Sequence, residues 1–174
     1  MRGPRVSPSL FPPLLAYHPD PEIAPPETDP VPTLNCRVVT PSKQLLDEEI
    51  AYASVPAWDG LFGVLPGHAP MVAELGTGEL KLEFPKDAGG DRSYLIDGGF
   101  VKVDASGVTV LAEHAVPAEE LSETDARAEL AEAEARTVPD GAADPAAEAD
   151  RIRRARDRAR LALRLAQTTK SKGI

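Results

Sequence analysis

Histidine and cysteine are the side chains of this sequence best suited to chemistry near neutral pH. There are three histidines, His18, His68 and His114, and one cysteine, Cys36. None has a His, Cys or carboxylate partner at metal-site spacing, so we expect no metal and no cofactor. Cys36 lies in the apolar run 34–40, which predicts a buried, unreactive side chain. A lone cysteine cannot form an internal disulfide, which favours a reducing compartment.

His68 lies in a glycine-rich stretch, residues 60–70, that could be taken for a phosphate-binding loop. A P-loop continues into Gly-Lys-Ser/Thr and opens a helix, and this stretch does neither. As a general base, His68 would need a nucleophile and an orienting acid beside it, and the sequence identifies neither. We therefore expect a shaped loop, no catalytic residue and no enzyme activity of the chain's own.

Charge reverses along the last third of the chain. Residues 119–150 contain eleven acidic residues and two basic ones, Arg127 and Arg136. The basic residues that follow, opposed only by Asp157, are Arg151, Arg153, Arg154, Arg156, Arg158, Arg160, Arg164, Lys170 and Lys172. Pairing between the two segments is one explanation. The other is an acidic protein partner, because Arg forms specific carboxylate pairs. The net charge of -9 and the absence of interleaved aromatics disfavour nucleic acid.

Cys36, His68 and the glycine-rich stretch lie in a part of the chain that is predicted to be rich in β-strands. From residue 34 to about residue 114, Gly, Pro and Asp break short apolar runs that lack helical periodicity. The predicted strands are Leu34–Thr40, Glu49–Val55, Leu61–Leu65, Met71–Glu74, Glu79–Phe84, Ser93–Asp97, Phe100–Val103 and Val108–Glu113. Residues 97–99 are expected to form a turn or bulge between strands, and residues 104–107 a tight hairpin. This spacing predicts an antiparallel β-sandwich or flattened barrel.

After residue 117 the apolar spacing becomes helical. Ser122 is a good N-cap for a helix to about Arg136, and Asp144-Pro145 begins a second helix to about Gln167. The two helices are expected to form an antiparallel hairpin. Its predicted inward positions are Ala126, Leu130, Ala133, Ile152, Ala155, Ala159, Ala162 and Ala166. Each alanine contact contributes only about 0.8 kcal/mol, so a partner could move the hairpin. A permanently docked hairpin is the open alternative.

The chain is therefore predicted to have an α+β fold in three segments. They are a disordered proline-rich tail at 1–33, a β-sandwich at 34–117 and a helical hairpin at 118–174. Residues 1–32 hold ten of the eighteen prolines. Pro12-Pro13 argues against a signal peptide, and acidic residues argue against a transit peptide; a misassigned start codon is an alternative. No apolar run approaches the ~20 residues that cross a bilayer, so any membrane role would need a partner.

Several short motifs follow one another in order along the chain. They are Val38-Val39-Thr40-Pro41, Val55-Pro56, Asp59-Gly60, Gly63-Val64-Leu65-Pro66-Gly67-His68-Ala69-Pro70, Gly78, Asp97-Gly98-Gly99-Phe100-Val101 and Val108-Thr109-Val110-Leu111-Ala112. In this order and spacing, residues 34–174 resemble the epsilon subunit family of bacterial F-type ATP synthases, equivalent to the mitochondrial delta subunit. The resemblance implies an N-terminal β-sandwich followed by two α-helices, which agrees with the pattern of strands and helices.

Members of that family are non-catalytic rotor subunits. The resemblance therefore implies a place in the central stalk of a proton-translocating ATP synthase, coupling the membrane rotor ring to the catalytic head. The implied partners are the gamma subunit and the rotor ring, which bind the sandwich, and the beta and alpha subunits of the head. The implied location is the cytoplasmic face of the bacterial inner membrane, held through the complex without membrane insertion.

The resemblance also implies site residues on the sandwich. Asp59, Leu61, Phe62 and His68 match the family loop near the ring and would bind the ring or gamma. Many members carry an acid where this chain has Leu61, and another where it has Lys102. An apolar tip made of Leu61 and Phe62 would therefore replace polar contacts made elsewhere in the family.

The family's hairpin can extend along gamma and suppress ATP hydrolysis, with an acidic segment of the beta subunits as its usual counterpart. The residues implied to make this contact are Arg153, Arg154, Arg156, Arg158 and Arg160. Some members bind ATP through an Ile/Leu-Asp-x-x-Arg-Ala motif. This chain keeps Arg127 but has Glu123 and Thr124 for the apolar residue and the Asp, which argues against nucleotide binding. The alternative function is a stand-alone β-sandwich binding module with a helical dimerisation hairpin.

Overall fold

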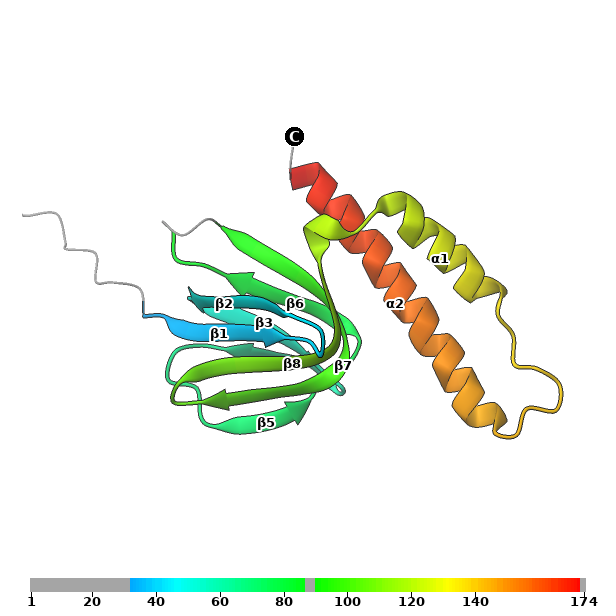
Figure 1. Cartoon of the computed structure of the whole chain (residues 1–174), viewed down its shortest axis with the longest axis horizontal. Helices are drawn as coiled ribbons and strands as arrows, with labels where there is room; N and C mark the ends of the chain where they lie inside the picture. Colours follow the sequence, from blue (N-terminus) through cyan, green and yellow to red (C-terminus); the bar gives the residue numbers. More distant parts are fainter. Residues whose placement is uncertain (1–31, 87–89, 173–174) are drawn as a thin grey trace, which may run out of the picture. The chain divides into compact units, whose positions relative to one another are not determined.

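The computed structural model describes residues 32–86 and 90–172 (Figure 1). In this part of the chain the strands are β1 Leu34–Val39, β2 Gln44–Ile50, β3 Tyr52–Ala57, β4 Gly60–Val64, β5 Met71–Glu74, β6 Gly78–Glu83, β7 Asp91–Asp104 and β8 Gly107–Pro117. A 3-10 turn, η1 Ala118–Glu120, leads to the helices α1 Glu123–Ala135 and α2 Pro145–Lys172. The predicted β-sandwich followed by two helices is confirmed. The predicted tail lies almost wholly outside the described residues.

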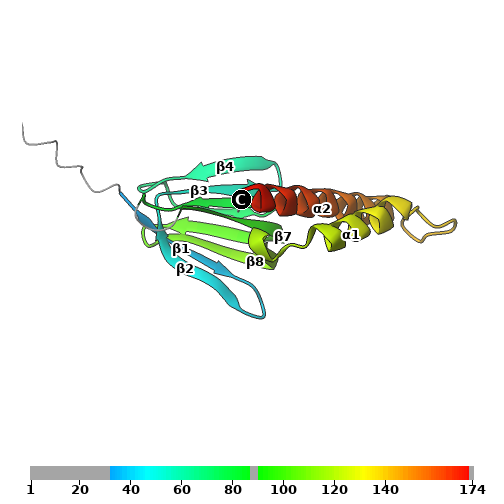
Figure 2. The ribbon, with the colours of Figure 1, turned by 90° about the horizontal axis from the view of Figure 1, so that it is seen from above.

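One continuous sheet path builds the sandwich, in the order β2-β1-β8-β7-β6-β3-β4, with β5 added beside β7. β7 is long enough to pair with β6 along its first half and with β5 along its second half. β8 runs along the other side of β7 over most of its length. The strands curve around one interior (Figures 1 and 2). The buried apolar side chains that fill it include Val38, Ile50, Leu80 and Val110.

Two strand predictions need correction. The predicted strand Glu49–Val55 is the end of β2 and the start of β3, since β2 pairs with β1 while β3 pairs with β6. β2 lies at the edge of the sheet, and its centre consists of Asp47, Glu48 and Glu49. Charged residues are typical of an edge strand. Because they interrupt the alternation of apolar residues, the strand is hard to recognise in the sequence. Residues 93–103 form one strand, not two, because β7 pairs with β8 on both sides of Gly98.

Gly99 has the backbone conformation that this long strand requires. Its φ is +114°, and a Cβ there would collide with the carbonyl oxygen of Leu111. We expect Gly99→Ala to lower the free energy of unfolding by about 2 kcal/mol, from backbone strain and this clash together. Gly141→Ala is the matched control, because Gly141 has a φ of +89° with nothing within 4 Å of a Cβ. Urea denaturation would contradict this explanation if both variants lost the same stability.

The helical hairpin has the predicted caps and most of the predicted interior. The hydroxyl of Ser122 accepts a hydrogen bond from the N–H of Asp125 at 3.3 Å, and the carboxylate of Asp144 accepts one from the N–H of Ala147 at 3.0 Å. The buried hairpin residues are Ala126, Ala133, Ile152, Ala159, Leu161, Ala162, Leu165 and Ala166. Of the predicted inward positions, Leu130 and Ala155 are only half-buried.

Two leucines that were not among the predicted inward positions dock the hairpin on the sandwich. Leu161 and Leu165 cluster with Leu95 of β7 and with Ala118 of η1. Leu95 lies between two residues that face the sandwich interior, so it points outward to meet α2. The contact is therefore more apolar than the alanine positions predicted, and the hairpin is docked in this structure.

Candidate functional site

The side chains that could do chemistry lie apart from one another. Cys36 is fully buried, and burial, with a smaller effect from the charge of Asp47, raises the pKa of its thiol to about 12. Its prediction as a buried hydrophobe is confirmed. His68 Nδ1 lies 2.8 Å from the carbonyl oxygen of Ala69, and His114 is exposed. Among the described residues, no group of three or more His, Cys, Asp or Glu could hold a metal ion.

The residues predicted to bind the ring or gamma do not share one loop. Trp58 and Asp59 form a two-residue turn between the paired residues at the ends of β3 and β4. β4 then pairs along β3, and a second turn follows in which the N–H of His68 donates to the carbonyl of Leu65 at 3.0 Å. Asp59 and Leu61 therefore lie at one end of β4, and His68 lies beyond the other. The predicted strand Leu61–Leu65 is confirmed as β4, so the glycine-rich stretch 60–70 is a strand followed by a turn and not one shaped loop.

The exposed tip of the first turn does not consist of Leu61 and Phe62, as predicted. Trp58 and Leu61 are 72% and 70% exposed. Phe62 is half-buried and packs against the sandwich interior, because it lies on the opposite face of β4 from Leu61. The apolar tip is therefore Trp58 with Leu61, and Phe62 supports it from within. Lys102, the other departure from the family, lies far along β7 and forms a 2.6 Å ion pair with Asp104.

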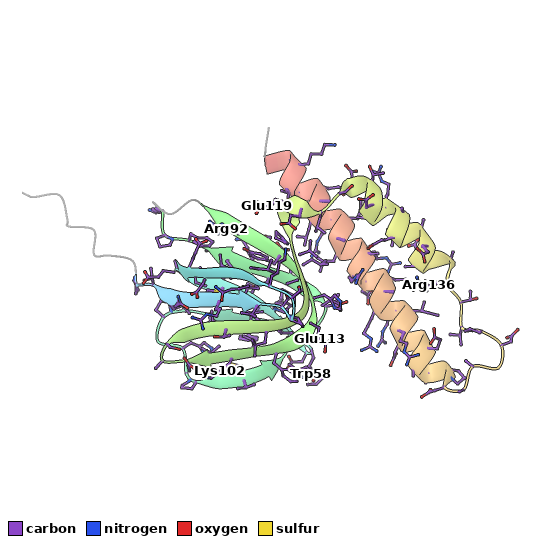
Figure 3. All side chains as sticks on the ribbon, in the orientation of Figure 1. Trp58, Arg92, Lys102, Glu113, Glu119 and Arg136 are labelled. Atoms are coloured by element: carbon purple, nitrogen blue, oxygen red, sulfur yellow. The ribbon has the colours of Figure 1, made fainter. Side chains whose placement is uncertain are left out.

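The structure has a second apolar surface, which was not predicted from the sequence. Val72, Phe100 and Leu111, which we call the apolar face, are 68%, 56% and 50% exposed. Phe100 of β7 pairs directly with Leu111 of β8, and Val72 of β5 pairs with Lys102, whose side chain is labelled in Figure 3. Clustered exposed apolar side chains mark interaction surfaces. The signal in the sequence was Leu111 itself, an apolar residue in phase with the outward-facing Thr109 and Glu113 of its strand.

Three of the five arginines predicted to be regulatory contact other elements of the chain. Arg156 donates to backbone carbonyls at the end of α1: Nε to Ala133 at 3.0 Å, and Nη2 to Glu134 at 3.2 Å and to Arg136 at 2.7 Å. Arg158 lies 3.8 Å from Asp97 of β7 and 3.6 Å from Glu129 of α1. Arg160 lies 3.2 Å from the carboxylate of Glu134. Pairing between the helices thus accounts for part of the charge reversal.

The two remaining arginines of this set, Arg153 and Arg154, form no ion pair with another helix or strand of the described residues. Arg153 pairs at 3.0 Å with Asp150 of its own helix, and Arg154 makes no ion pair with the rest of the described chain. Arg160 remains largely exposed despite its partner. Arg127, which is kept from the nucleotide motif, is exposed and pairs at 2.6 Å with Glu123 of the same helix. Arg153, Arg154 and Arg160 are therefore the predicted residues best placed to meet an acidic surface.

These features define a class of protein: a small β-sandwich with an exposed apolar face and a docked, charged helical hairpin. Residues 33–118 match the family model described as ATP synthase, Delta/Epsilon chain, beta-sandwich domain. The chain is 40% identical over 101 residues to the ATP synthase epsilon chain of Rhodopirellula baltica, covering 58% of this chain and 77% of that one. It is 33% identical over 117 residues to that of Jannaschia sp., covering 66% and 86%. The chain belongs to the epsilon-chain family of ATP synthases.

Solved structures agree with this family. A chain of the Euglena gracilis mitochondrial ATP synthase, in a structure of OSCP, F1 and c-ring, has a TM-score of 0.56 and 25% identity. The match covers 97% of this chain and 99% of that one. A chain from the central stalk and c-ring of the Tetrahymena thermophila enzyme shares the fold, with a TM-score of 0.52 and 18% identity over 76% of this chain and 96% of that one. None of the described helices of this chain is long and apolar enough to span a bilayer.

Proposed function

We propose that this subunit is a non-catalytic part of the rotor that couples the membrane ring to the catalytic head of a proton-translocating ATP synthase. It would be peripheral, held by the complex at the cytoplasmic face of the bacterial inner membrane. The observation that carries the proposal is the apolar face, Val72, Phe100 and Leu111, on the outside of a sandwich whose interior is already filled.

The partner proposed for the apolar face is the gamma subunit. Burying a Val, Leu or Phe side chain contributes about 1.5–3 kcal/mol, so three such residues at the centre of an interface supply much of a stable contact. Glu74 and Lys102 lie opposite Phe100 and Val72 in the strand pairing and form a charged border that fixes orientation. This composition, an apolar centre with a charged rim, is typical of protein–protein interfaces.

The proposed contacts with the ring and gamma divide between the two ends of β4. Trp58, Asp59 and Leu61 at the β3–β4 turn would meet the rotor ring, with Phe62 anchoring the turn in the interior. His68 at the far turn would meet gamma. A tight turn presents its side chains with little loss of conformational entropy on binding, which suits a contact that must transmit torque.

The proposed role of the hairpin is to restrain ATP hydrolysis by binding acidic segments of the beta and alpha subunits. The support is the set of exposed arginines on α2, chiefly Arg153, Arg154 and Arg160, which fit carboxylates bidentately. The docked hairpin would then be the arrangement in which this contact is withheld.

Co-purification tests the proposed function. The full chain carrying an affinity tag, expressed in its native host, is expected to bring down gamma, the ring subunits and beta in one complex. The competing function, a stand-alone module that dimerises through its hairpin, predicts elution of the chain alone as a dimer. That second result, found in detergent that preserves the ATP synthase, would contradict the proposal.

A further inference from the structure

The β3–β4 turn lies at the edge of the sheet, where its own hairpin gives it little support. β4 is the last strand of the sheet path. β3 pairs with β6 along residues 52–54, and Pro56 and Ala57 lie beyond that pairing. A hairpin of two strands is only marginally stable by itself in water. The exposed side chains of Trp58 and Leu61 therefore need another contact to fix their position (Figure 3).

Residues 74–76, which we call the brace, supply this contact. Two hydrogen bonds join the brace to the end of β3. The N–H of Trp58 donates to the carbonyl oxygen of Glu74 at 3.2 Å, and the N–H of Gly76 donates to the carbonyl oxygen of Pro56 at 3.1 Å. An isolated antiparallel bridge lies between these two bonds. The brace thus acts as a short third strand beside the end of β3.

The brace is also attached on its other side, to β7. The N–H of Leu75 donates to the carbonyl oxygen of Gly99 at 2.9 Å, and Glu74 pairs with Phe100, a member of the apolar face. The side chain of Leu75 is buried in the sandwich interior. On the surface, Trp58 and Phe100 line the same cleft. Three residues of backbone therefore connect the β3–β4 turn to the apolar face.

Gly76 allows the brace to approach the turn this closely. A Cβ at this position would lie 2.8 Å from the carbonyl oxygen of Ala57 and 3.3 Å from the Cα of Trp58. Both are backbone atoms, which cannot turn aside as the end of a flexible side chain can. Any larger residue would therefore push the backbone of the turn away from the brace. Glycine is typical of places where two backbones pass in close contact.

We propose that the brace holds the β3–β4 turn and the apolar face as one rigid unit, and that Gly76 is the positioning residue for the turn. The inference rests on the proposed function, in which the turn meets the rotor ring and the apolar face binds gamma. Torque passes between two partners without slack only if the surfaces that contact them keep a fixed relative position. A turn that is already held in place also loses little conformational entropy on binding.

Amide hydrogen exchange, followed by NMR on the free full-length chain, tests the brace. In Gly76→Ala the exchange of the Trp58 N–H is expected to rise about tenfold, because the added methyl group separates this N–H from Glu74, while the amides of β8 are unchanged. Gly90→Ala is the matched control, since Gly90 has a φ of +83° with nothing within 4 Å of a Cβ. Equal exchange of the Trp58 N–H in the two variants would overturn the proposal.

A milder variant covers the case in which Gly76→Ala does not fold. An amide-to-ester substitution at Gly76, introduced during cell-free translation, removes the N–H that donates to Pro56 and adds no side chain. It is expected to raise the exchange of the Trp58 N–H about threefold, because one of the two bonds to the brace remains. An unchanged rate in the ester variant would count against the brace.

Two binding measurements separate a positioning role from a general loss of stability. Gly76→Ala is expected to bind gamma as tightly as the original chain, because the apolar face is unaltered. The complex of this variant with gamma should bind the detergent-solubilised rotor ring about tenfold more weakly than the original complex, a difference of about 1.4 kcal/mol. An equal loss of both affinities would indicate a merely structural glycine, and undiminished binding to the ring would also contradict the proposal.

A separate result would count against the proposed function alone. If gamma binds the ring equally tightly with and without the original subunit, the β3–β4 turn does not contact the ring. The exchange of the Trp58 N–H in the free chain would still decide whether the brace holds the turn.

Discussion

Phe100→Asp combined with Leu111→Asp is expected to weaken binding of the subunit to gamma about a thousandfold. The two side chains are paired across β7 and β8 and form two thirds of the apolar face. Losing their burial costs about 1.5–3 kcal/mol each, and a thousandfold change in affinity corresponds to about 4.1 kcal/mol. Two carboxylates in a desolvated contact add to that loss. Isothermal titration of the purified variant into gamma measures the effect.

The fold should survive this double substitution because both side chains are at least half exposed. Thermal unfolding of the free variant is therefore expected to match that of the original chain. Val138→Asp is the matched control, since Val138 is also an exposed apolar residue but lies beyond α1, far along the chain from the apolar face. Unaltered affinity in the double variant, or an equal loss in the control, would mean that gamma binds elsewhere.

Replacing Arg153, Arg154 and Arg160 together by Ala is expected to weaken the proposed binding of the hairpin to the catalytic head about a hundredfold. Truncating one partner of a buried interface ion pair typically costs about 2–5 kcal/mol, and a hundredfold change needs about 2.7 kcal/mol. ATP hydrolysis by the reconstituted complex should then rise to the rate measured with a subunit that ends at Pro117. Arg156 is left out of this set because it caps α1.

The control for the arginine variant is Arg127→Ala with Arg136→Ala. These arginines are exposed on the same hairpin and pair only within α1, at 2.6 and 2.7 Å. Their removal lowers the positive charge without touching the proposed contact, so the rate of hydrolysis should not change. Equal activation by both variants would show that the effect comes from the total charge of the hairpin and not from the arginine positions on α2.

The sequence was enough to predict elements with strong local signals. The alternation in residues 79–84 predicted β6, because Leu80 and Leu82 are buried on one face while charged side chains occupy the other. Ser122 and Asp144 predicted the starts of α1 and α2, because a capping side chain acts on the N–H groups two or three residues ahead. In both cases the residues that determine the structure are close together in the chain.

What the sequence could not show depends on contacts between distant segments. β2 was missed because its acidic centre makes sense only at the edge of a sheet. The role of Arg156 depends on a helix end twenty residues away. Leu161 and Leu165 look like ordinary helix positions until Leu95 is brought beside them. The apolar face joins β5, β7 and β8, so no single strand reveals it, although Leu111 gave a partial signal.

The most direct test of a coupling role in the rotor is ATP-driven proton pumping by membranes stripped of this subunit. Adding back the full chain is expected to restore pumping, whereas the Phe100→Asp, Leu111→Asp variant should not restore it at the same concentration. The pH-sensitive dye signal per ATP hydrolysed is the quantity to compare, because it reports coupling separately from hydrolysis. Pumping that is equally strong with and without the added chain would contradict the proposed coupling role.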